Sequence, residues 1–258
     1  MELKTFMKNL YKAYTMNNVY VNGGFGVTLK GNQIDRHINL NSYNREHEKQ
    51  IRKAAENFPC FGFDCIGLIK GIVWGWCGDS DKVYGGATYE LGEIEDIALS
   101  NFFTRYGGDI KYITNTDYPL YVGSLLWSSG HIAVYIGEGV AIESTRYSDR
   151  IRFVRVKGMK SDFHELPERE FTAYANFLLL DANVVWDREM VTNFMLNGNT
   201  ENPTPKPTVK YRYLKVIDSE GEVVCVEPNA LQDMIDNVTL KFPIMITEDF
   251  TDEADWGK

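Results

Sequence analysis

The sequence predicts an α+β fold, with helices in its first part and an antiparallel sheet after them. Two observations support this prediction. Apolar residues recur at helical spacing near the start of the chain and then fill a short continuous run after Asp64, and short apolar segments bounded by turn residues follow one another between residues 120 and 180. Helices followed by a run of strands are typical of α+β domains. With 258 residues, 44% of them hydrophobic, the chain is long enough for one larger domain and a smaller one.

The first part of the chain contains two amphipathic segments and one apolar segment. Residues 2–17 alternate apolar side chains with lysines at helical spacing, which predicts a helix packed on the domain. Residues 27–45 are polar and predict a loop, and residues 45–57 predict a charged surface helix that Pro59 ends. Residues 63–76 are apolar on nearly every side of a helix, so we expect this helix to be enclosed by other elements.

Cys65 stands at the first turn of the enclosed helix. Asp64 precedes it and is a good N-cap, because its carboxylate can accept from the free amides of the first turn. The positive end of the helix dipole favours a thiolate, so we expect the pKa of Cys65 to lie below the reference of about 8.5. This position predicts a nucleophile, and a buried cysteine that serves as a small hydrophobe fits the same pattern. Gly67, Gly71 and Gly75 form a stripe on one side of the helix, which predicts the close approach of another element.

A cysteine nucleophile needs a base and a group that orients the base. His131 opens a predicted strand, and the sequence Gly137-Glu138-Gly139 after it predicts a three-residue hairpin loop that pairs Ile136 with Val140. This register places Glu143 on the face of His131, at a diagonal distance of roughly 7–8 Å. Glu143 then fixes one imidazole nitrogen and leaves the other for the cysteine, whereas a two-residue turn would place it on the opposite face. Both residues also fit ordinary strand positions.

The composition excludes several classes of protein. The net charge of -9 argues against a nucleic-acid-binding protein, which normally carries a basic face. Four cysteines are too few for a disulfide scaffold and lack the spacing of a zinc site. We expect neither a metal nor an organic cofactor, because attack by a cysteine with a histidine base needs none. No segment is long enough to span a bilayer and no signal peptide is evident, so we expect no stable membrane insertion. His37, His47 and His164 lie in polar segments and are weaker candidates for the base.

The residues around Cys65 and His131 resemble the NlpC/P60 family of papain-like cysteine peptidases, which cut peptides of the bacterial cell wall. The Phe-Asp-Cys-Ser-Gly-Leu motif of the family stands here as Phe63-Asp64-Cys65-Ile66-Gly67-Leu68. Its histidine strand stands as His131-Ile132-Ala133-Val134-Tyr135-Ile136-Gly137, with Glu143 at the third polar position. The Tyr-x-x-Gly-Gly motif of the family matches residues 20–24, and the likeness spans residues 18–180. A glutamate as the third member is also similar to the related CHAP amidases and endopeptidases.

This resemblance implies a peptidoglycan hydrolase that cleaves an amide bond of the stem peptides through an acyl-enzyme. It implies Cys65 as the nucleophile, His131 as the base and Glu143 as the residue that orients His131. Tyr20 and Asp64 are expected near the substrate and the oxyanion. The enzyme is expected to be either a cysteine endopeptidase or an N-acetylmuramoyl-L-alanine amidase. Two alternatives stay open: an inactive wall-binding or phage-tail protein on the same fold, and a papain-like acyltransferase or amidase with a substrate outside the wall.

The chain divides into three parts in this interpretation. Residues 1–185 form the papain-like peptidase domain, and residues 186–208 form a short helix and a linker with three alternating prolines. Residues 209–258 form a small acidic α/β domain, with a helix after Pro228, that binds the wall or joins copies of the chain into a homo-oligomer. This arrangement resembles a bacteriophage endolysin. We expect such an enzyme to be made in the host cytoplasm and to act on peptidoglycan after release through a holin pore.

Overall fold

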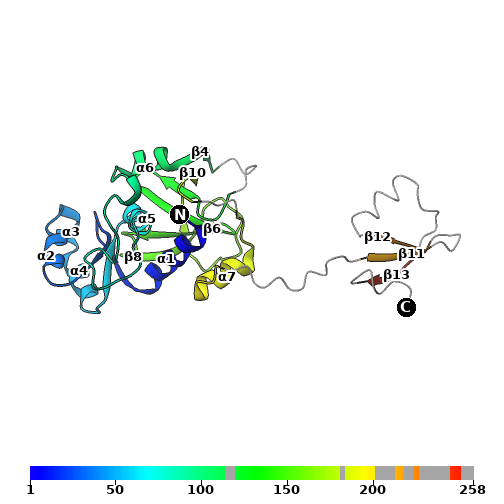
Figure 1. Cartoon of the computed structure of the whole chain (residues 1–258), viewed down its shortest axis with the longest axis horizontal. Coiled ribbons are helices and arrows are strands. Elements are labelled where there is room, and N and C mark those ends of the chain that lie inside the picture. Colours follow the sequence, from blue (N-terminus) through cyan, green and yellow to red (C-terminus); the bar gives the residue numbers. More distant parts are fainter. Residues whose placement is uncertain (114–119, 181–183, 201–212, 218–222, 227–244, 251–258) are drawn as a thin grey trace. The chain divides into compact units, whose positions relative to one another are not determined.

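The computed structural model of the protein describes residues 1–113, 120–180, 184–200, 213–217, 223–226 and 245–250. The chain divides into two compact units, Met1–Glu201 and Asn202–Lys258, and Figure 1 labels their helices and strands. The first unit combines helices with mixed β-sheets, so the predicted α+β class is confirmed at this level.

A seven-stranded sheet forms the centre of the first unit. Its strand order is β4-β10-β5-β6-β7-β8-β9, and every neighbouring pair is antiparallel except β8 with β9. The strands are β4 (Gly107–Tyr112), β5 (Leu125–Ser128), β6 (His131–Gly137), β7 (Val140–Thr145), β8 (Arg150–Val156), β9 (Glu168–Arg169) and β10 (Ala173–Phe177). Strands β5 to β8 follow the predicted meander. The fifth strand predicted after them is β10, which pairs with β5 and β4 and not with β8. The edge strands β4 and β9 were not predicted from the apolar pattern.

Helices and sheet share one large buried core. Alternate residues of β6, Ile132, Val134 and Ile136, pack in this core with side chains of four helices. The helices are α1 (Leu3–Thr15), α5 (Cys65–Val73), α6 (Leu99–Tyr106) and α7 (Arg188–Asn197). The other residues of β6, Ala133 and Tyr135, belong to a smaller core on the opposite face of the sheet. Strand β6 is therefore buried on both faces, which explains its almost continuous apolar sequence.

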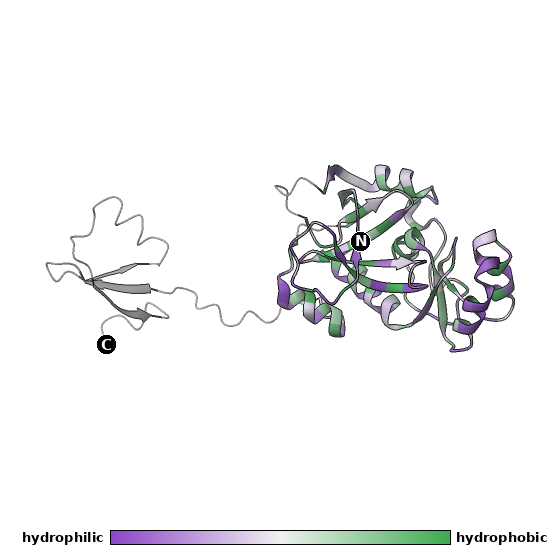
Figure 2. Cartoon of the chain, turned by 180° about the vertical axis from the view of Figure 1, so that it is seen from behind, coloured by the Kyte–Doolittle hydropathy of each residue, from purple (hydrophilic) through white to green (hydrophobic). Residues whose placement is uncertain are grey.

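A second, three-stranded sheet lies before α5 in the sequence. It has the order β1-β3-β2 and consists of β1 (Asn17–Tyr20), β2 (Phe25–Thr28) and β3 (Cys60–Phe63). The predicted loop over residues 27–45 is wrong, because part of β2 and the helices α2 (Asn32–Ile38) and α3 (Ser42–Glu46) lie there. Each of these short helices buries only one or two side chains, so no amphipathic period develops. Helix α4 (Glu48–Ala55) follows, and Figure 2 shows hydrophilic residues along these helices.

Two further points concern the domain limits. Helix α7, which the sequence grouped with the linker, packs on the first unit, where the fully buried Phe194 has its ring centroid 5.6 Å from that of Tyr11. In the second unit, β11 (Tyr213–Ile217) pairs antiparallel with β12 (Val223–Val226) and β13 (Met245–Phe250). The proline-rich linker and the helix expected after Pro228 lie outside the described residues.

Candidate functional site

Helix α5 begins at Cys65 because Asp64 caps it, as predicted. Its Oδ1 accepts from the backbone amide of Gly67 at 2.6 Å, and its Oδ2 accepts from the amide of Gly23 at 2.8 Å. Burial raises the pKa of Asp64, although both amide hydrogen bonds oppose the rise. The carboxylate thus holds the helix start and the loop after β1 together. These contacts give Asp64 a positioning role at the start of the helix that bears Cys65.

The glycine stripe allows the loop after Tyr20 to approach α5. A Cβ atom at Gly67 would lie 1.9 Å from the carbonyl oxygen of Gly24, and a Cβ atom at Gly71 would lie 2.4 Å from that of Phe25. Only residues without a side chain permit these backbone contacts. Gly75 serves a different purpose, because it follows the helix with φ +95°, where a side chain would be strained.

Cys65 lies where the start of α5 meets the start of β6. Its exposed fraction is only 7%. Burial and the charge of Asp64 raise the pKa of Cys65 to about 12, although the backbone amides of Ile132, Ile66 and Cys65 itself favour the thiolate. The predicted decrease in this pKa is therefore wrong, because the loss of hydration outweighs the helix start. The sulfur is a thiol at neutral pH, so its reaction requires a base that takes the proton.

His131 has the partner that the strand register predicts. Its Nε2 lies 2.6 Å from Oε2 of Glu143, and Glu143 is fully buried. Burial alone raises the pKa of Glu143, but the hydrogen bond from His131 and the charges of His131, Arg169 and Arg152 lower it below its ordinary value. Glu143 is therefore a carboxylate that can only accept, so Nε2 carries the hydrogen and Nδ1 is the nitrogen that can take a proton.

The turn between β6 and β7 differs from the predicted one, yet Glu143 keeps its face. The loop has two residues, Glu138 and Gly139, both with positive φ, and Gly137 pairs with Val140. A β-bulge before Gly137 adds one residue to β6 and compensates for the shorter loop. The predicted register is restored beyond it, where Val134 pairs with Ile142. The loop length was wrong, and the placement of Glu143 beside His131 is confirmed.

Two arginines complete the surroundings of Glu143. Arg152 lies directly opposite on β8 and donates through Nε to Oε1 of Glu143 at 3.0 Å. Nε of Arg169 lies 3.5 Å from Oε2. Sequence analysis missed both residues. For Arg152 the available signal was the interleaving of basic with apolar residues between residues 151 and 156, and no comparable pattern marks Arg169.

Tyr20 lies beside this cluster. It lines a cavity of about 90 Å³ that His131 also lines. Burial and the neighbouring Cys65 raise the pKa of the Tyr20 phenol, so the hydroxyl stays protonated and can donate a hydrogen bond. The fold thus brings Tyr20, Cys65, His131 and Glu143 into one neighbourhood. His37 instead bonds the carbonyl of Gln33 within α2, His47 stacks on Tyr43, and His164 is exposed.

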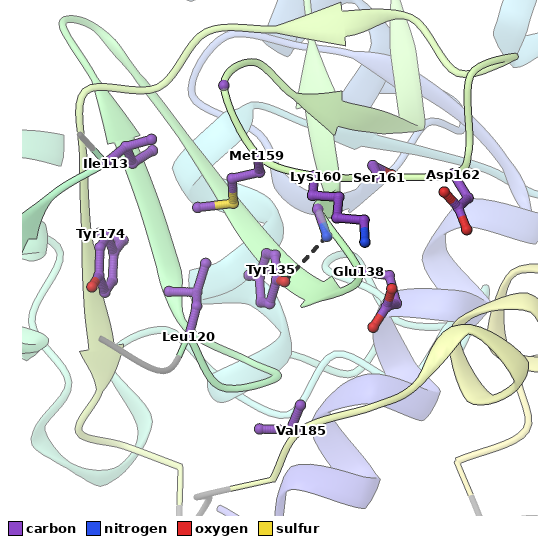
Figure 3. A pocket seen from close by; sticks show the side chains of 12 residues that line it. Ile113, Leu120, Tyr135, Glu138, Met159, Lys160, Ser161, Asp162, Tyr174 and Val185 are labelled. Carbon is purple, nitrogen blue, oxygen red and sulfur yellow. Dashed lines mark hydrogen bonds between the residues drawn. The ribbon is translucent and has the colours of Figure 1, made fainter. Parts of the chain in front are cut away.

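Two larger cavities lie on the opposite face of the sheet from α5. Their volumes are about 520 and 610 Å³, and neither is lined by Cys65, His131 or Glu143. Figure 3 shows the first cavity, in which Met159, Leu120 and Tyr135 lie close together and the Tyr135 hydroxyl accepts from the amide of Gly139 at 3.2 Å.

Within the described part of the chain, no three His, Cys, Asp or Glu side chains form a group that could hold a metal ion. No helix among those residues is both long and apolar enough to cross a membrane.

Fold and site together define an α+β domain that carries a cysteine at a helix start and a histidine–glutamate pair on adjacent strands. Comparisons of the chain with protein-family models, with curated proteins and with solved structures found no match. The function is therefore inferred from the geometry of the site and from the motifs that carry its residues.

Proposed function

We propose that the protein is a peptidoglycan hydrolase with a papain-like domain and a Cys-His-Glu triad. The observation that carries the proposal is the 2.6 Å contact between His131 and Glu143, placed beside the helix start that bears Cys65. A buried carboxylate that fixes one imidazole nitrogen leaves the other nitrogen to act as a base. The order cysteine, histidine and third polar residue is that of the NlpC/P60 motifs, with Glu143 at the position where the family usually has His, Asn or Gln.

The geometry supports the following reaction. With substrate bound, Nδ1 of His131 takes the proton of the Cys65 thiol, and the sulfur attacks the carbonyl carbon of the amide. Because burial raises the pKa of Cys65 to about 12, proton transfer accompanies the attack in place of a resting ion pair. The backbone amide of Cys65 and the hydroxyl of Tyr20 stabilise the oxyanion. His131 returns the proton to the leaving amine, and water hydrolyses the thioester to the acid and the free thiol.

The motif resemblance supports peptidoglycan as the substrate and an endolysin as the biological setting. In this proposal the chain is made in the host cytoplasm, passes a holin pore and cuts a stem-peptide amide as an endopeptidase or an amidase. The second unit then serves as the wall-binding or oligomerising module. Two properties of Cys65 favour the inactive wall-binding alternative. Its side chain is only 7% exposed, and its thiol is protonated, so the sulfur is a weak nucleophile at rest.

Digestion of purified bacterial walls tests the proposal. Cys65→Ala and Cys65→Ser should reduce the release of soluble fragments by at least about 10³-fold, because the nucleophile is lost. Cys77→Ser is the matched control, since Cys77 is an exposed free thiol. Mass spectrometry of the released fragments names the bond that is cut. Undiminished lysis by Cys65→Ala refutes the mechanism, and wall binding without any fragment release by the unmodified protein supports the inactive alternative.

A further inference from the structure

The small cavity beside His131 has the lining of an anion-binding site. Its volume is about 90 Å³, and its wall contains two guanidinium groups, two aliphatic hydroxyl groups, two phenols and an imidazole, but no carboxylate. The lining residues are Tyr20, Ser129, Gly130, His131, Thr145, Arg146, Tyr147 and Arg169. A water molecule occupies about 30 Å³ in the liquid, so this space matches roughly three waters or one small anionic group.

Positive charge exceeds negative charge around this cavity. The carboxylate of Glu143, which lies beside His131 and Arg169, is fully buried and already accepts from His131 and Arg152. Arg169 has an ion-pair distance of 3.5 Å to Glu143, and its Nε is buried without a hydrogen-bond partner. Arg146 makes no ion pair with a carboxylate among the described residues. The surplus of cations contrasts with the net charge of -9 of the whole chain.

Tyr147 holds the two guanidinium groups at the cavity. The guanidinium carbon of Arg169 lies 4.8 Å from the Tyr147 ring centroid, and that of Arg146 lies 5.6 Å from it. Hydrogen bonds from Arg146 and Arg169 lower the pKa of the Tyr147 phenol. The charge of Arg146 also opposes the rise in the pKa of Tyr20 and of Tyr43. At Tyr20 this effect of Arg146 is smaller than those of Cys65 and Asp64, which raise the pKa of the phenol, so the positive charge is concentrated where Arg146 and Arg169 line the cavity.

We propose that Arg146 and Arg169 bind a carboxylate of the substrate, on the residue next to the amide that is cut. The inference rests on the proposed function and narrows its substrate to peptides with a free carboxylate at that position. The planar guanidinium group suits a carboxylate, because parallel N–H donors match its two oxygens. His131 lines the same cavity, so a carboxylate held there fixes the neighbouring amide beside the reacting groups.

Arg146 is the better residue to alter, because Arg169 also contacts Glu143 and its loss would disturb the triad. Arg146→Gln removes the charge and keeps most of the side chain. Arg150→Gln is the matched control, since Arg150 is an exposed arginine of the same β7–β8 turn region that does not line the cavity. Both variants remove one positive charge, so a general change in attraction to an anionic wall affects them equally.

The first experiment compares two soluble synthetic peptides that contain the amide cut by the unmodified protein. They differ only next to that amide, where one carries a glutamate carboxylate and the other a glutamine carboxamide. The unmodified protein and Arg150→Gln should prefer the carboxylate by about 10- to 100-fold in kcat/KM. Arg146→Gln should lose most of this preference through an increase in KM. Equal cleavage of both peptides by the unmodified protein would overturn the inference. An equal decrease in kcat/KM for both peptides in Arg146→Gln would overturn it as well.

The second experiment does not depend on turnover. The full chain with Cys65→Ala is titrated in a calorimeter with N-acetylglutamate amide and with N-acetylglutamine amide. Binding of the carboxylate alone, abolished by adding Arg146→Gln, supports the inference even if no wall is hydrolysed, and in that case only the proposed function fails. Hydrolysis without such selectivity keeps the function and removes the inference. If inorganic phosphate competes with N-acetylglutamate amide more tightly than acetate does, the assignment of a carboxylate as the ligand is overturned.

Discussion

The carboxylate of Glu143 should be essential for activity, and Glu143→Gln tests this with almost no change in volume. A carboxylate accepts from both Nε2 of His131 at 2.6 Å and Nε of Arg152 at 3.0 Å. A glutamine amide has only one accepting oxygen. If that oxygen faces Arg152, the NH₂ group faces His131, so Nε2 must accept and Nδ1 must carry the hydrogen. That tautomer cannot take the proton of Cys65.

The contacts of Glu143 set the size of the expected effects of Glu143→Gln on the rate and on the free energy of unfolding. A wrong tautomer in a comparable triad costs about 10⁴ in rate, so we expect a loss of about 10²–10⁴, or about 3–5 kcal/mol of activation free energy. Removing one partner of a buried ion pair costs about 3–5 kcal/mol. The side chains of Arg152 and Arg169 are 24% and 20% exposed. We therefore expect a smaller decrease in the free energy of unfolding, of about 2–3 kcal/mol, because solvent screens them.

Two assays separate catalysis from stability. Release of wall fragments is measured at about 20 °C, well below the usual unfolding temperature of a domain, so that the variant stays folded. Thermal unfolding of the same variant is followed by circular dichroism. Glu165→Gln is the matched control, because it removes the same charge from an exposed position. Activity of Glu143→Gln within about threefold of this control would show that Glu143 does not orient His131.

Two further predictions concern the start of α5. Gly67→Ala should lower the free energy of unfolding in urea by about 1–3 kcal/mol, because the added Cβ would lie 1.9 Å from the Gly24 oxygen; helix propensity alone predicts a gain of about 1 kcal/mol, so a more stable variant would contradict this packing. Iodoacetamide at pH 7 should label the exposed Cys77 before Cys65. Since burial raises the pKa of Cys65 to about 12, its labelling rate should rise about tenfold per pH unit between pH 8 and pH 11, and fast labelling at pH 7 would contradict the buried thiol.

Much of the candidate site was predictable because its signals are local. An aspartate before an apolar helical run predicts a cap, and Asp64 caps α5 through Gly67. Alternation along β6 and β7 placed Glu143 on the face of His131, although the turn was misjudged by one residue. The bulge that compensates involves Gly137, and no pattern of apolar and polar residues reports such an insertion. Glu143 therefore lies on the predicted face because the loop is one residue shorter than predicted and the bulge adds one residue to β6.

Other features depend on distant segments that meet only in the folded chain. The pKa of Cys65 was expected to fall, since the helix start is visible in the sequence, whereas the burial that raises it comes from packing against β6. Arg152 and Arg169 reach Glu143 from β8 and β9, and their ion pairs depend on strand pairing over separations that the sequence does not encode locally. The short helices α2 and α3 went unpredicted because each buries too few side chains to show a period.

The sequence by itself determined the α+β class, the start of α5 at Cys65, and the shared face of His131 and Glu143. Capping and strand alternation act between residues close in the chain, so their effects can be read from residue order. Tertiary structure decided the protonation of the cysteine, the arginines around Glu143 and the cationic cavity beside His131. Burial and charge density depend on which segments pack together, and only the folded chain brings residues 20, 65, 131, 143 and 169 into one place.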